Sequence, residues 1–375
     1  MGVMKWQITP IRAHRVTDVA GVTLAHAEAS SLTRGRFDTG PDRCRARLHT
    51  VSSPFTFAIA MRTRFRGITT REGMLIEGEA GWAEFSPFWD YGARESVAWL
   101  AAARAGADHA WPDPVRQSIP VNVTVPAVDP ERAAQIVRAG RGCRTAKVKV
   151  AEPGQVLGED IGRVEAVRDA LGPGGKVRVD ANGGWDTVTA VTAIAALDRA
   201  AGGLEYVEQP CRSTAELAAV RRRVDVPVAA DESIRHEDDP LRVAALEAAD
   251  IAVLKVQPLG GVRRALAVAE ACGLPVVVSS ALETSVGLAA GIALAAALPE
   301  LPYACGLATM ALLDGDVTSE PLLPIDGFVS VRTVTPDVRA SVAAQEETSL
   351  RWHERWAAVA DCGLGPKTLG PERSA

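Results

Sequence analysis

Five charged residues stand at the C-terminal ends of short apolar segments in this 375-residue chain. They are Lys149, Asp180, Glu208, Asp231 and Lys255. Successive members are 31, 28, 23 and 24 residues apart, about the length of one strand and one helix. In a (β/α)8 barrel the C-terminal ends of the strands meet at one face. The spacing therefore predicts three carboxylates between two lysines at the mouth of such a barrel.

The three carboxylates would offer only hard oxygen ligands to a metal. Asp180, Glu208 and Asp231 have no His or Cys among them, and the six histidines are dispersed away from the expected strand ends. Carboxylate oxygens favour Mg2+ or Mn2+, whereas zinc sites use mainly nitrogen and sulfur ligands. We therefore expect a Mg2+ site that would also accept Mn2+.

Lys149 and Lys255 are candidates for proton transfer, and Lys147 stands beside Lys149 on the same strand. Lys147 and Lys149 share one face of their strand, where two charges are costly unless carboxylates or a metal compensate them. One interpretation is that both lysines only form structural ion pairs. The other is that Lys149 removes a proton from the carbon next to a substrate carboxylate, because a neighbouring cation lowers the pKa of a lysine. A divalent ion would stabilise the resulting enediolate. Lys255 lies four strands further on and should face Lys149 across the substrate.

Eight apolar segments are expected to form the strands. They are residues 121–125, 146–150, 177–180, 206–209, 227–232, 252–255, 275–280 and 303–307. Amphipathic segments lie between most of them, which indicates parallel strands with right-handed helical crossovers. We predict an α/β fold with a TIM-like (β/α)8 or (β/α)7β barrel. A doubly wound sheet is the alternative, but the sequence lacks the Gly-rich phosphate-binding turn that usually follows its first strand.

The chain divides into five expected parts. Residues 1–53 lack apolar periodicity and are predicted to be a disordered or non-native extension. Residues 54–118 suggest three strands and a helix, which would form an α+β capping domain before a barrel at 119–307. Residues 308–335 should return to the cap, and residues 336–375 should form a C-terminal helix and tail.

Composition limits the partners. A net charge of −5 gives no overall nucleic-acid signal, and the longest uncharged apolar segment, 286–298, is too short to span a bilayer. The six cysteines are scattered without a C-x-x-C pair, which favours reduced core residues. We expect a cytoplasmic enzyme for a small carboxylate substrate, without nucleic-acid or membrane partners, that is a monomer or a weak homo-oligomer.

Five motifs together resemble a known family. They are K-x-K (147–149), D-x-N (180–182), E-Q-P (208–210), D-E-S (231–233) and L-K-V-Q-P-L-G-G (254–261). The series is similar to the muconate-lactonising subgroup of the enolase superfamily, and within it to the o-succinylbenzoate synthases of actinobacterial type. The resemblance covers about residues 55–330.

The resemblance implies a dehydration that forms o-succinylbenzoate on the path to menaquinone. Lys149 would be the base and Lys255 would stabilise the enediolate by its charge, while the three carboxylates would bind Mg2+. Supporting roles would fall to Lys147, Arg178, Asn182 and Glu232. Expected substrate contacts are Arg64 and Arg66 from a loop of the cap, with Ser279, Ser280, Thr284, Ser285 and Gly306 from the barrel. Solvation of a turn by the arginines and helix capping by the hydroxyls are the alternatives.

Two other functions remain open. An N-succinylamino-acid racemase or dipeptide epimerase would use the same two lysines, one on each face of the substrate. Some racemising relatives carry an arginine three residues after the second lysine, where this chain has Pro258. A barrel kept only as a binding or scaffold protein would be expected to have lost a ligand or a lysine, and all five residues are present.

Deletion of residues 1–50 should leave the melting temperature and the activity unchanged, because this segment lacks the apolar periodicity needed to pack. The segment holds eight Lys or Arg against four Asp or Glu, so a basic arm that binds an acidic partner is the alternative interpretation. Thermal unfolding of the full and shortened chains makes the comparison. A clear drop in melting temperature or activity would contradict the prediction.

Overall fold

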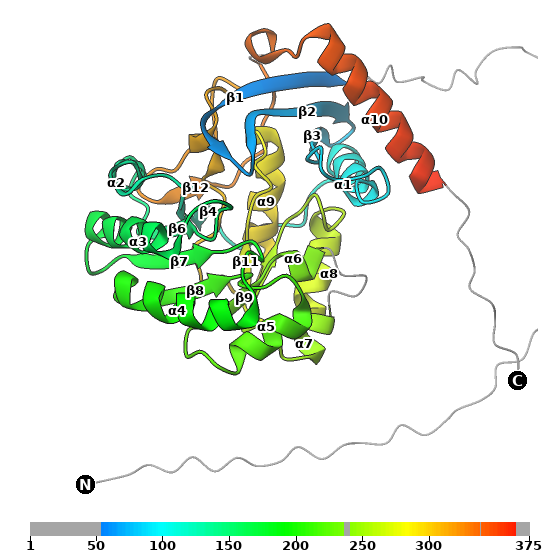
Figure 1. Cartoon of the computed structure of the whole chain (residues 1–375). Coiled ribbons are helices and arrows are strands. Elements are labelled where there is room, and N and C mark those ends of the chain that lie inside the picture. The colour runs from blue at the N-terminus through cyan, green and yellow to red at the C-terminus, as the bar shows by residue number, and fades with distance from the viewer. Residues whose placement is uncertain (1–53, 236–240, 338, 365–375) are drawn as a thin grey trace, which may run out of the picture. The chain divides into compact units, whose positions relative to one another are not determined.

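Seven parallel strands form the central sheet in this computed structural model, which describes residues 54–235, 241–337 and 339–364 (Figure 1). The expected extension at 1–53 and the end of the tail lie outside the described residues. The strands follow one another in chain order across the sheet. They are β5 (Val123–Val125), β6 (Thr145–Lys149), β7 (Lys176–Asp180), β8 (Leu204–Glu208), β9 (Val228–Ala230), β10 (Ile251–Leu254) and β11 (Val276–Val278).

The eighth expected strand, 303–307, is reduced to two isolated bridges. Cys305 pairs in parallel with Val121 just before β5, and Gly306 pairs in parallel with Ser279 just after β11. These pairings join the two edges of the sheet. The barrel therefore follows the (β/α)7β plan, the second of the two that the sequence allowed.

Strand alternation separates the charged residues from the apolar core. Lys149, Asp180 and Glu208 are neighbours in register on β6, β7 and β8. The residue before each of them, such as Val148 or Val179, is fully buried in the main core. Successive side chains of a strand point to opposite faces. Apolar residues therefore face the helices and the charged ones face the barrel interior.

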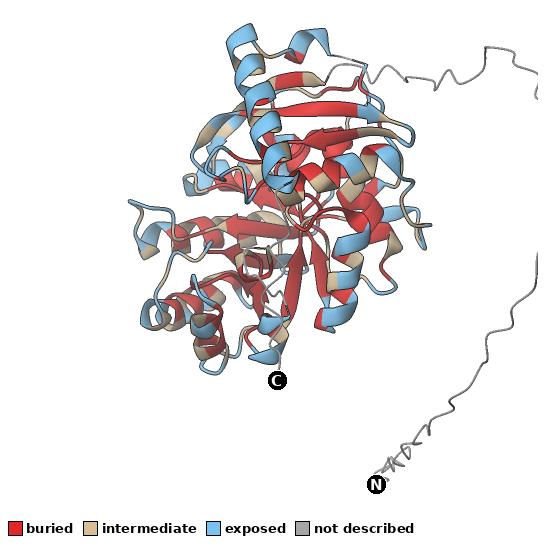
Figure 2. Cartoon of the chain, turned by 90° about the vertical axis from the view of Figure 1, so that its right-hand side faces the viewer, coloured by how far each residue is buried: buried red, intermediate tan, exposed pale blue. Residues whose placement is uncertain are grey.

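Helices cover the outer face of the sheet. They are α2 (Pro130–Arg138), α3 (Leu157–Leu171), α4 (Thr187–Ala201), α5 (Thr214–Arg221), α6 (Glu232–Arg235), α7 (Arg242–Ala245), α8 (Val262–Cys272) and α9 (Ser285–Ala297). Side-chain caps begin several of them, as Asp186 does for α4 by accepting a hydrogen bond from the Thr189 backbone nitrogen. Figure 2 shows exposed residues on the outer faces of most of these helices and buried residues on the strands. Helices α6 and α9 have no exposed residue. The expected helix after residue 240 is only one turn long, because Glu247 has a left-handed φ of 48°.

The cap is a three-stranded antiparallel sheet with two helices. Its strands are β1 (Phe55–Phe65), β2 (Ile68–Gly78) and β3 (Gly81–Phe85), and its helices are α1 (Val97–Asp108) and the C-terminal α10 (Glu346–Leu364). Trp352 of α10 is fully buried and meets Phe85 edge-on, with ring centroids 6.0 Å apart. Helix α10 is thereby packed onto the cap.

The segment after the barrel, residues 308–335, contacts first the cap and then strand β4 (Ser118–Pro120). A short 3-10 helix, η1 (Thr309–Leu312), leads to a bridge between Leu313 and Met61 of the cap. Further on, β12 (Phe328–Ser330) pairs with β4, just before the first barrel strand. The segment expected to return to the cap thus begins at the cap and ends beneath the barrel.

The composition led us to expect reduced cysteines and no membrane-spanning segment. Cys143, Cys211, Cys272 and Cys305 are free and buried, whereas Cys362 on α10 is free and exposed. Among the described residues, no helix combines the length and the apolarity required to span a bilayer.

Buried polar groups join the cap to the barrel. The Glu84 carboxylate of β3 accepts hydrogen bonds from the backbone nitrogen (3.0 Å) and the hydroxyl (2.5 Å) of Thr284 at the start of α9. It also accepts one from the Ser86 hydroxyl at 2.6 Å. Burial raises the pKa of Glu84 to about 7; the Arg71 charge opposes this shift, and the neighbouring Glu283 adds to it.

Glu84→Gln should change how stability depends on pH. Because the folded protein keeps Glu84 protonated between the ordinary pKa of 4.5 and about 7, the wild-type free energy of unfolding falls as pH rises through that window. The fall from this group is at most about 3 kcal/mol. We therefore expect the stability of the variant relative to wild type to rise from pH 4.5 to pH 7 and then to level off.

Urea unfolding between pH 4.5 and pH 8 measures this difference. The matched control is Glu79→Gln, at an exposed position on the turn between β2 and β3. A stability difference between Glu84→Gln and wild type that does not vary with pH would contradict the prediction.

Candidate active site

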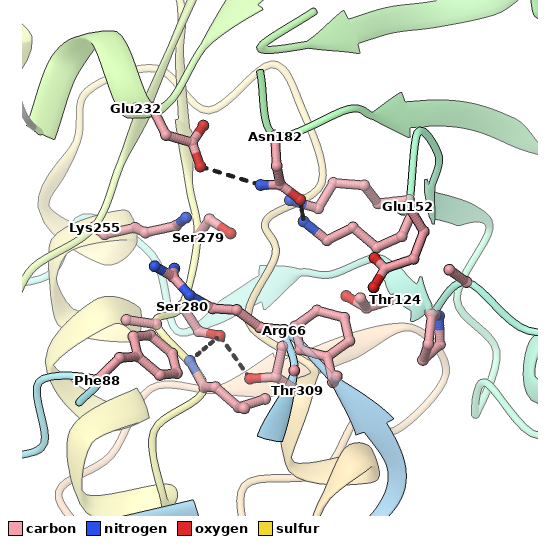
Figure 3. Close-up of a pocket in the computed structure, with 18 of the residues that line it drawn as sticks. Arg66, Phe88, Thr124, Glu152, Asn182, Glu232, Lys255, Ser279, Ser280 and Thr309 are labelled. Carbon is pink, nitrogen blue, oxygen red and sulfur yellow. Dashed lines mark hydrogen bonds between the residues drawn. The ribbon is translucent and has the colours of Figure 1, made fainter. Parts of the chain in front are cut away.

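A cavity of about 740 Å3 opens at the C-terminal ends of the barrel strands, with the cap on its other side (Figure 3). Lys147, Lys149 and Lys255 line it from the barrel. Arg64 at the end of β1 and Arg66 in the turn between β1 and β2 line it from the cap. The structure thus brings the expected lysines and the expected cap arginines to one space.

Lys149 is held by two oxygen atoms. Its Nζ lies 2.6 Å from Asp180 Oδ2 and 2.6 Å from Asn182 Oδ1. The Asn182 amide donates in turn to Glu232 at 3.1 Å. Burial lowers the pKa of Lys149, and the charge on Lys147 lowers it further, although Asp180 opposes the shift. Lys149 is therefore nearer to the neutral, basic form than an ordinary lysine.

Lys147 lies one layer deeper and behaves in the opposite way. Its Nζ is 3.0 Å from Asp180 Oδ2 and 2.9 Å from Glu208 Oε1, and its side chain is only 7% exposed. Burial disfavours the charged form, but Glu208 and Asp180 outweigh burial and raise the pKa of Lys147 well above its usual value. This lysine is a permanent cation and a poor base.

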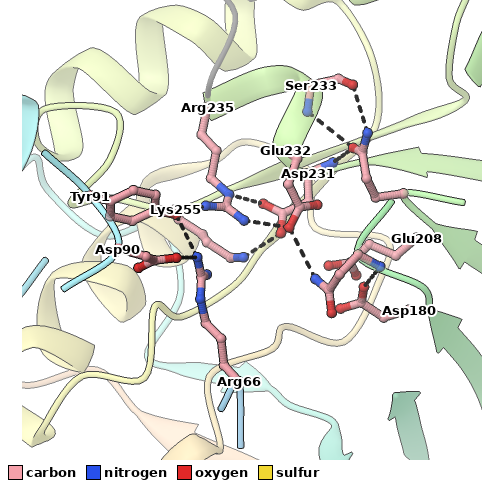
Figure 4. A network of polar contacts seen from close by, with 12 residues as sticks. Arg66, Asp90, Tyr91, Asp180, Glu208, Asp231, Glu232, Ser233, Arg235 and Lys255 are labelled. Carbon is pink, nitrogen blue, oxygen red and sulfur yellow. Dashed lines mark hydrogen bonds and ion pairs between the residues drawn. The ribbon is translucent and has the colours of Figure 1, made fainter. Parts of the chain in front are cut away.

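Lys255 approaches from the opposite part of the barrel. It follows β10, and its Nζ lies 2.5 Å from Asp231 Oδ2. The other oxygen of Asp231 accepts a hydrogen bond from Arg235 Nε at 3.1 Å. Burial opposes ionisation, yet Arg235 and Lys255 hold the pKa of Asp231 below its usual range. Figure 4 shows this chain of contacts.

The three expected metal ligands fit a hard divalent ion in their chemistry. Asp180, Glu208 and Asp231 are fully buried at adjacent strand ends. Burial, with the charges of Asp180 and Asp231, raises the pKa of Glu208 to about 7, and a divalent cation would relieve that repulsion.

The present spacing of these carboxylates is set by ion pairs. Within the described ranges no three His, Cys, Asp or Glu side chains converge as a preformed metal cage. Asp180 and Glu208 both face Lys147, and Asp231 faces Lys255. The donor set therefore suits Mg2+ or Mn2+, and a bound ion would compete with the lysines for these oxygens.

The cap reaches these groups through Arg66. Its Nη2 lies 3.1 Å from Asp90 Oδ2 and 3.0 Å from the Tyr91 hydroxyl, and its guanidinium stacks 4.3 Å from the centre of the Phe88 ring. The Tyr91 hydroxyl also accepts a hydrogen bond from Arg235. A continuous polar path therefore runs from the cap to Asp231 (Figure 4).

Three expected substrate contacts lie away from the cavity. Ser279 and Ser280 line it, but Thr284, Ser285 and Gly306 do not. The Thr284 hydroxyl donates to Glu84, and the Ser285 hydroxyl accepts from the Leu322 backbone, since both residues begin α9 under the cap. Gly306 lies behind Ser279, and a Cβ at this position would come within 2.5 Å of the Ser279 hydroxyl. In this structure these three residues make structural contacts outside the cavity. Their expected contact with the substrate stays a prediction.

Arg178 supports the barrel below the cavity. Its Nε lies 2.5 Å from Glu205 Oε2, and its Nη1 donates to the Ala304 carbonyl at 2.7 Å. The guanidinium also stacks on Tyr206 at 4.6 Å. Arg178 therefore ties β7 to the shortened eighth strand and is not among the residues that line the cavity.

Several residues that line the cavity were not expected from the sequence. They include Thr124, Glu152, Arg212, Arg235 and Thr309. A signal existed for Arg235, which stands four residues after Asp231 on α6 and pairs with it. Glu152 and Arg212 follow the ends of β6 and β8 closely, so distance from a strand end would have suggested both.

Two family models match the chain. The model described as enolase C-terminal domain-like matches residues 130–336, and the model described as enolase N-terminal domain-like matches residues 56–107. The first spans more than half of the chain.

Curated relatives match over most of their length. The o-succinylbenzoate synthase of Thermobifida fusca (strain YX) is 65% identical over 304 residues, which are 81% of this chain and 94% of that relative. The o-succinylbenzoate synthase of Mycobacterium tuberculosis (strain ATCC 25618 / H37Rv) is 56% identical over 76% of this chain and 85% of its own length. The o-succinylbenzoate synthase of Mycolicibacterium smegmatis is 53% identical over 82% of this chain and 94% of its own length.

Solved structures share the fold. The L-Ala-D/L-Glu epimerase from Bacillus subtilis superposes with a TM-score of 0.63 at 24% identity, covering 76% of this chain and 96% of that one. A muconate lactonizing enzyme from Pseudomonas fluorescens superposes with a TM-score of 0.63 at 21% identity, covering 80% of this chain and 97% of that one. At these identities the likeness concerns the fold alone.

Mg2+ should bind at the three carboxylates and raise the melting temperature by a few degrees, because a ligand of the folded state stabilises it. Differential scanning calorimetry with and without 10 mM MgCl2, at matched ionic strength, measures the shift, which Glu208→Gln should abolish. Asp186→Asn is the control, since this exposed helix cap should leave the Mg2+ response intact. Equal shifts in wild type and Glu208→Gln would place the ion elsewhere.

Proposed function

The chain belongs to the enolase superfamily, in its muconate-lactonising subgroup, and from this premise we propose that it is an o-succinylbenzoate synthase. The observation that carries the substrate assignment is the 65% identity to the Thermobifida fusca synthase over 94% of that relative. The reaction type is supported by the two lysines and three carboxylates that lie together at the barrel mouth.

The reaction is a syn elimination of water. The substrate, 2-succinyl-6-hydroxy-2,4-cyclohexadiene-1-carboxylate, loses the proton beside its carboxylate and the neighbouring hydroxyl, and the ring becomes aromatic. One base can serve both steps when proton and hydroxyl leave from the same face. The product is o-succinylbenzoate, a precursor in menaquinone biosynthesis.

Lys149 is the proposed base. Burial lowers its pKa, which favours the neutral amine relative to an ordinary lysine, and Asp180 and Asn182 fix the direction of the nitrogen. After taking the proton, the ammonium of Lys149 hands it to the departing hydroxyl, so that water leaves. Lys147 is unsuited to this role because its charge is locked by two carboxylates.

Lys255 is proposed to stabilise the enediolate from the other side of the cavity. Its ammonium lies against Asp231, which orients it toward the space that Lys149 also lines. Mg2+ held by Asp180, Glu208 and Asp231 would, when bound, polarise the substrate carboxylate and make its α-proton more acidic.

The rest of the cavity suits a second carboxylate. Arg64 and Arg212 line it, and within the described residues neither forms an ion pair. Ser279 and Ser280 also line the cavity (Figure 3). We propose that this part of the cavity receives the succinyl arm. A cytoplasmic location, and a chain that is a monomer or a weak homo-oligomer, belong to the same proposal.

A racemase or epimerase is the second candidate, because Lys149 and Lys255 both line the cavity and could each serve one enantiomer. Pro258 also lines the cavity, at the position where some racemising relatives carry arginine. An apolar residue there favours the synthase.

Lys149→Ala should lower synthase turnover by about 10^3-fold or more, because the proposed base for the α-proton is lost. Lys255→Ala should also be severely impaired, through lost charge stabilisation. Lys255→Arg restores the charge and should recover part of the activity if the larger group fits. Spectrophotometric assay of purified protein with Mg2+ and the cyclohexadiene substrate measures each rate. Addition of a chelator should abolish the wild-type rate, and Mg2+ or Mn2+ should restore it.

Lys176→Ala is the matched control, since this exposed lysine begins β7 at the far end of the barrel. Exchange of the α-proton in D2O on N-succinylamino acids should be lost from one enantiomer in Lys149 variants and from the other in Lys255 variants. Wild-type turnover in Lys149→Ala with loss in Lys147→Ala would show that the wrong lysine was chosen. Absence of synthase turnover together with rapid racemisation would favour the second candidate.

A further inference from the structure

One wall of the cavity is a strained turn. Ser279, Ser280, Ala281 and Leu282 all line the cavity between β11 and α9. Leu282 has φ of 66°, a left-handed conformation that glycine adopts readily and a leucine rarely does. A conformation of this kind persists only where the surroundings enforce it.

The enforcing contacts come from Arg71 of β2, in the cap. Its Nε donates to the Leu282 carbonyl at 2.9 Å, and its Nη2 lies 3.3 Å from the Ala281 carbonyl. The same Nη2 donates to the Ser86 hydroxyl at 2.8 Å, while Nη1 donates to the Glu72 carbonyl at 3.1 Å. Arg71 is only 2% exposed and does not line the cavity. Its planar fork reaches acceptors on both sides of the domain boundary at once.

Neighbouring buried groups hold Arg71 itself in place. Burial lowers the pKa of Arg71, and the nearby side chains of Glu84 and Glu283 oppose that shift. Glu283 also accepts a hydrogen bond from the Ala281 backbone nitrogen at 2.7 Å, so the same turn is tied from both directions. On its other side, Arg71 stacks 4.4 Å from the ring of Phe88, which itself lines the cavity.

The network extends to the segment that carries Lys255. Gln257 accepts a hydrogen bond from the Ser86 backbone nitrogen at 3.2 Å, and its amide donates to Glu283 at 3.3 Å. The cap residues around Arg71 therefore fix the wall turn directly, whereas Gln257 links Ser86 of the cap to the Lys255 segment. A disturbance of Arg71 should reach the wall before it reaches the lysine.

We propose that Arg71 is a positioning residue that sets the shape of the substrate pocket from the cap, by holding Ala281 and Leu282 in their strained turn. This inference rests on the proposed function, since it assigns the wall to the part of the substrate remote from Lys149. Arg71 acts through the turn and touches no reacting atom. Pocket shape, and with it substrate selection, thus depends on the fit between cap and barrel.

Arg71→Lys tests the role while keeping the buried positive charge. A lysine has one nitrogen and cannot reach the acceptors on both sides, so the turn should loosen. We expect KM for the cyclohexadiene substrate to rise about 10-fold or more, with kcat within about 3-fold of wild type. Hydrogen–deuterium exchange of the ligand-free protein should be faster in a peptide that contains residues 279–284.

The matched control is Arg168→Lys. Arg168 of α3 also donates to three backbone carbonyls, those of Ala201, Gly172 and Gly175, around the helix ends on the outside of the barrel. The same chemical change there should leave KM and exchange at 279–284 unchanged, even if it lowers the melting temperature. A general loss of stability would affect both variants alike, whereas a positioning role singles out Arg71.

Ser86→Ala is the second variant, because it removes one acceptor of Arg71 without changing any charge and serves if Arg71→Lys fails to fold. It should raise KM about 3-fold and speed exchange in the same peptide. Unchanged exchange at 279–284 in the variants that fold, or a fall in kcat with KM unchanged, would overturn the proposal. Because the exchange measurement needs no substrate, it decides on Arg71 even if wild type lacks synthase turnover, which would count against the proposed function alone.

Discussion

Charge balance at the barrel mouth is the constraint on which the rest of the structure depends. Three buried carboxylates, Asp180, Glu208 and Asp231, are matched by Lys147, Lys149 and Lys255. Buried charges are tolerated only when they are paired and hydrogen-bonded. A divalent ion added to this balanced set would leave an excess of positive charge, which a substrate carboxylate would offset. Binding of the ion and binding of the anionic substrate should therefore favour each other.

The same constraint explains why two lysines on one strand differ. Lys147 and Lys149 are only two residues apart and have identical side chains. Lys147 faces two carboxylates and is locked as a cation, whereas Lys149 faces one carboxylate and an amide and also feels the charge of Lys147. The charge of the deeper lysine thus adds to burial in lowering the pKa of the outer one, which is the proposed base. Neither role can be assigned from residue type alone, because burial and neighbours decide the pKa.

How far the sequence predicts this protein follows from the range of each interaction. Strand alternation and the strand–helix repeat are local, so the residue pattern is enough to place Lys149, Asp180, Glu208, Asp231 and Lys255 at one mouth. The eighth strand is harder to predict, since it holds only through bridges at Cys305 and Gly306. Thr284 and Ser285 could not be placed, because the turn that aims them is fixed by cap residues about 200 positions earlier in the chain.

The proposed catalytic groups and the proposed substrate-selecting wall are positioned by different parts of the fold. The groups proposed for proton transfer and metal binding lie at the ends of barrel strands or directly after them, where the backbone pairing of the strands fixes their positions. The wall at Ser279–Leu282 belongs to a loop and is shaped by Arg71 and Glu84 from another domain. Substitutions at the domain interface can therefore alter the pocket while the lysines and carboxylates keep their places. Such a division lets a single catalytic barrel accept different carboxylate substrates through changes in its cap.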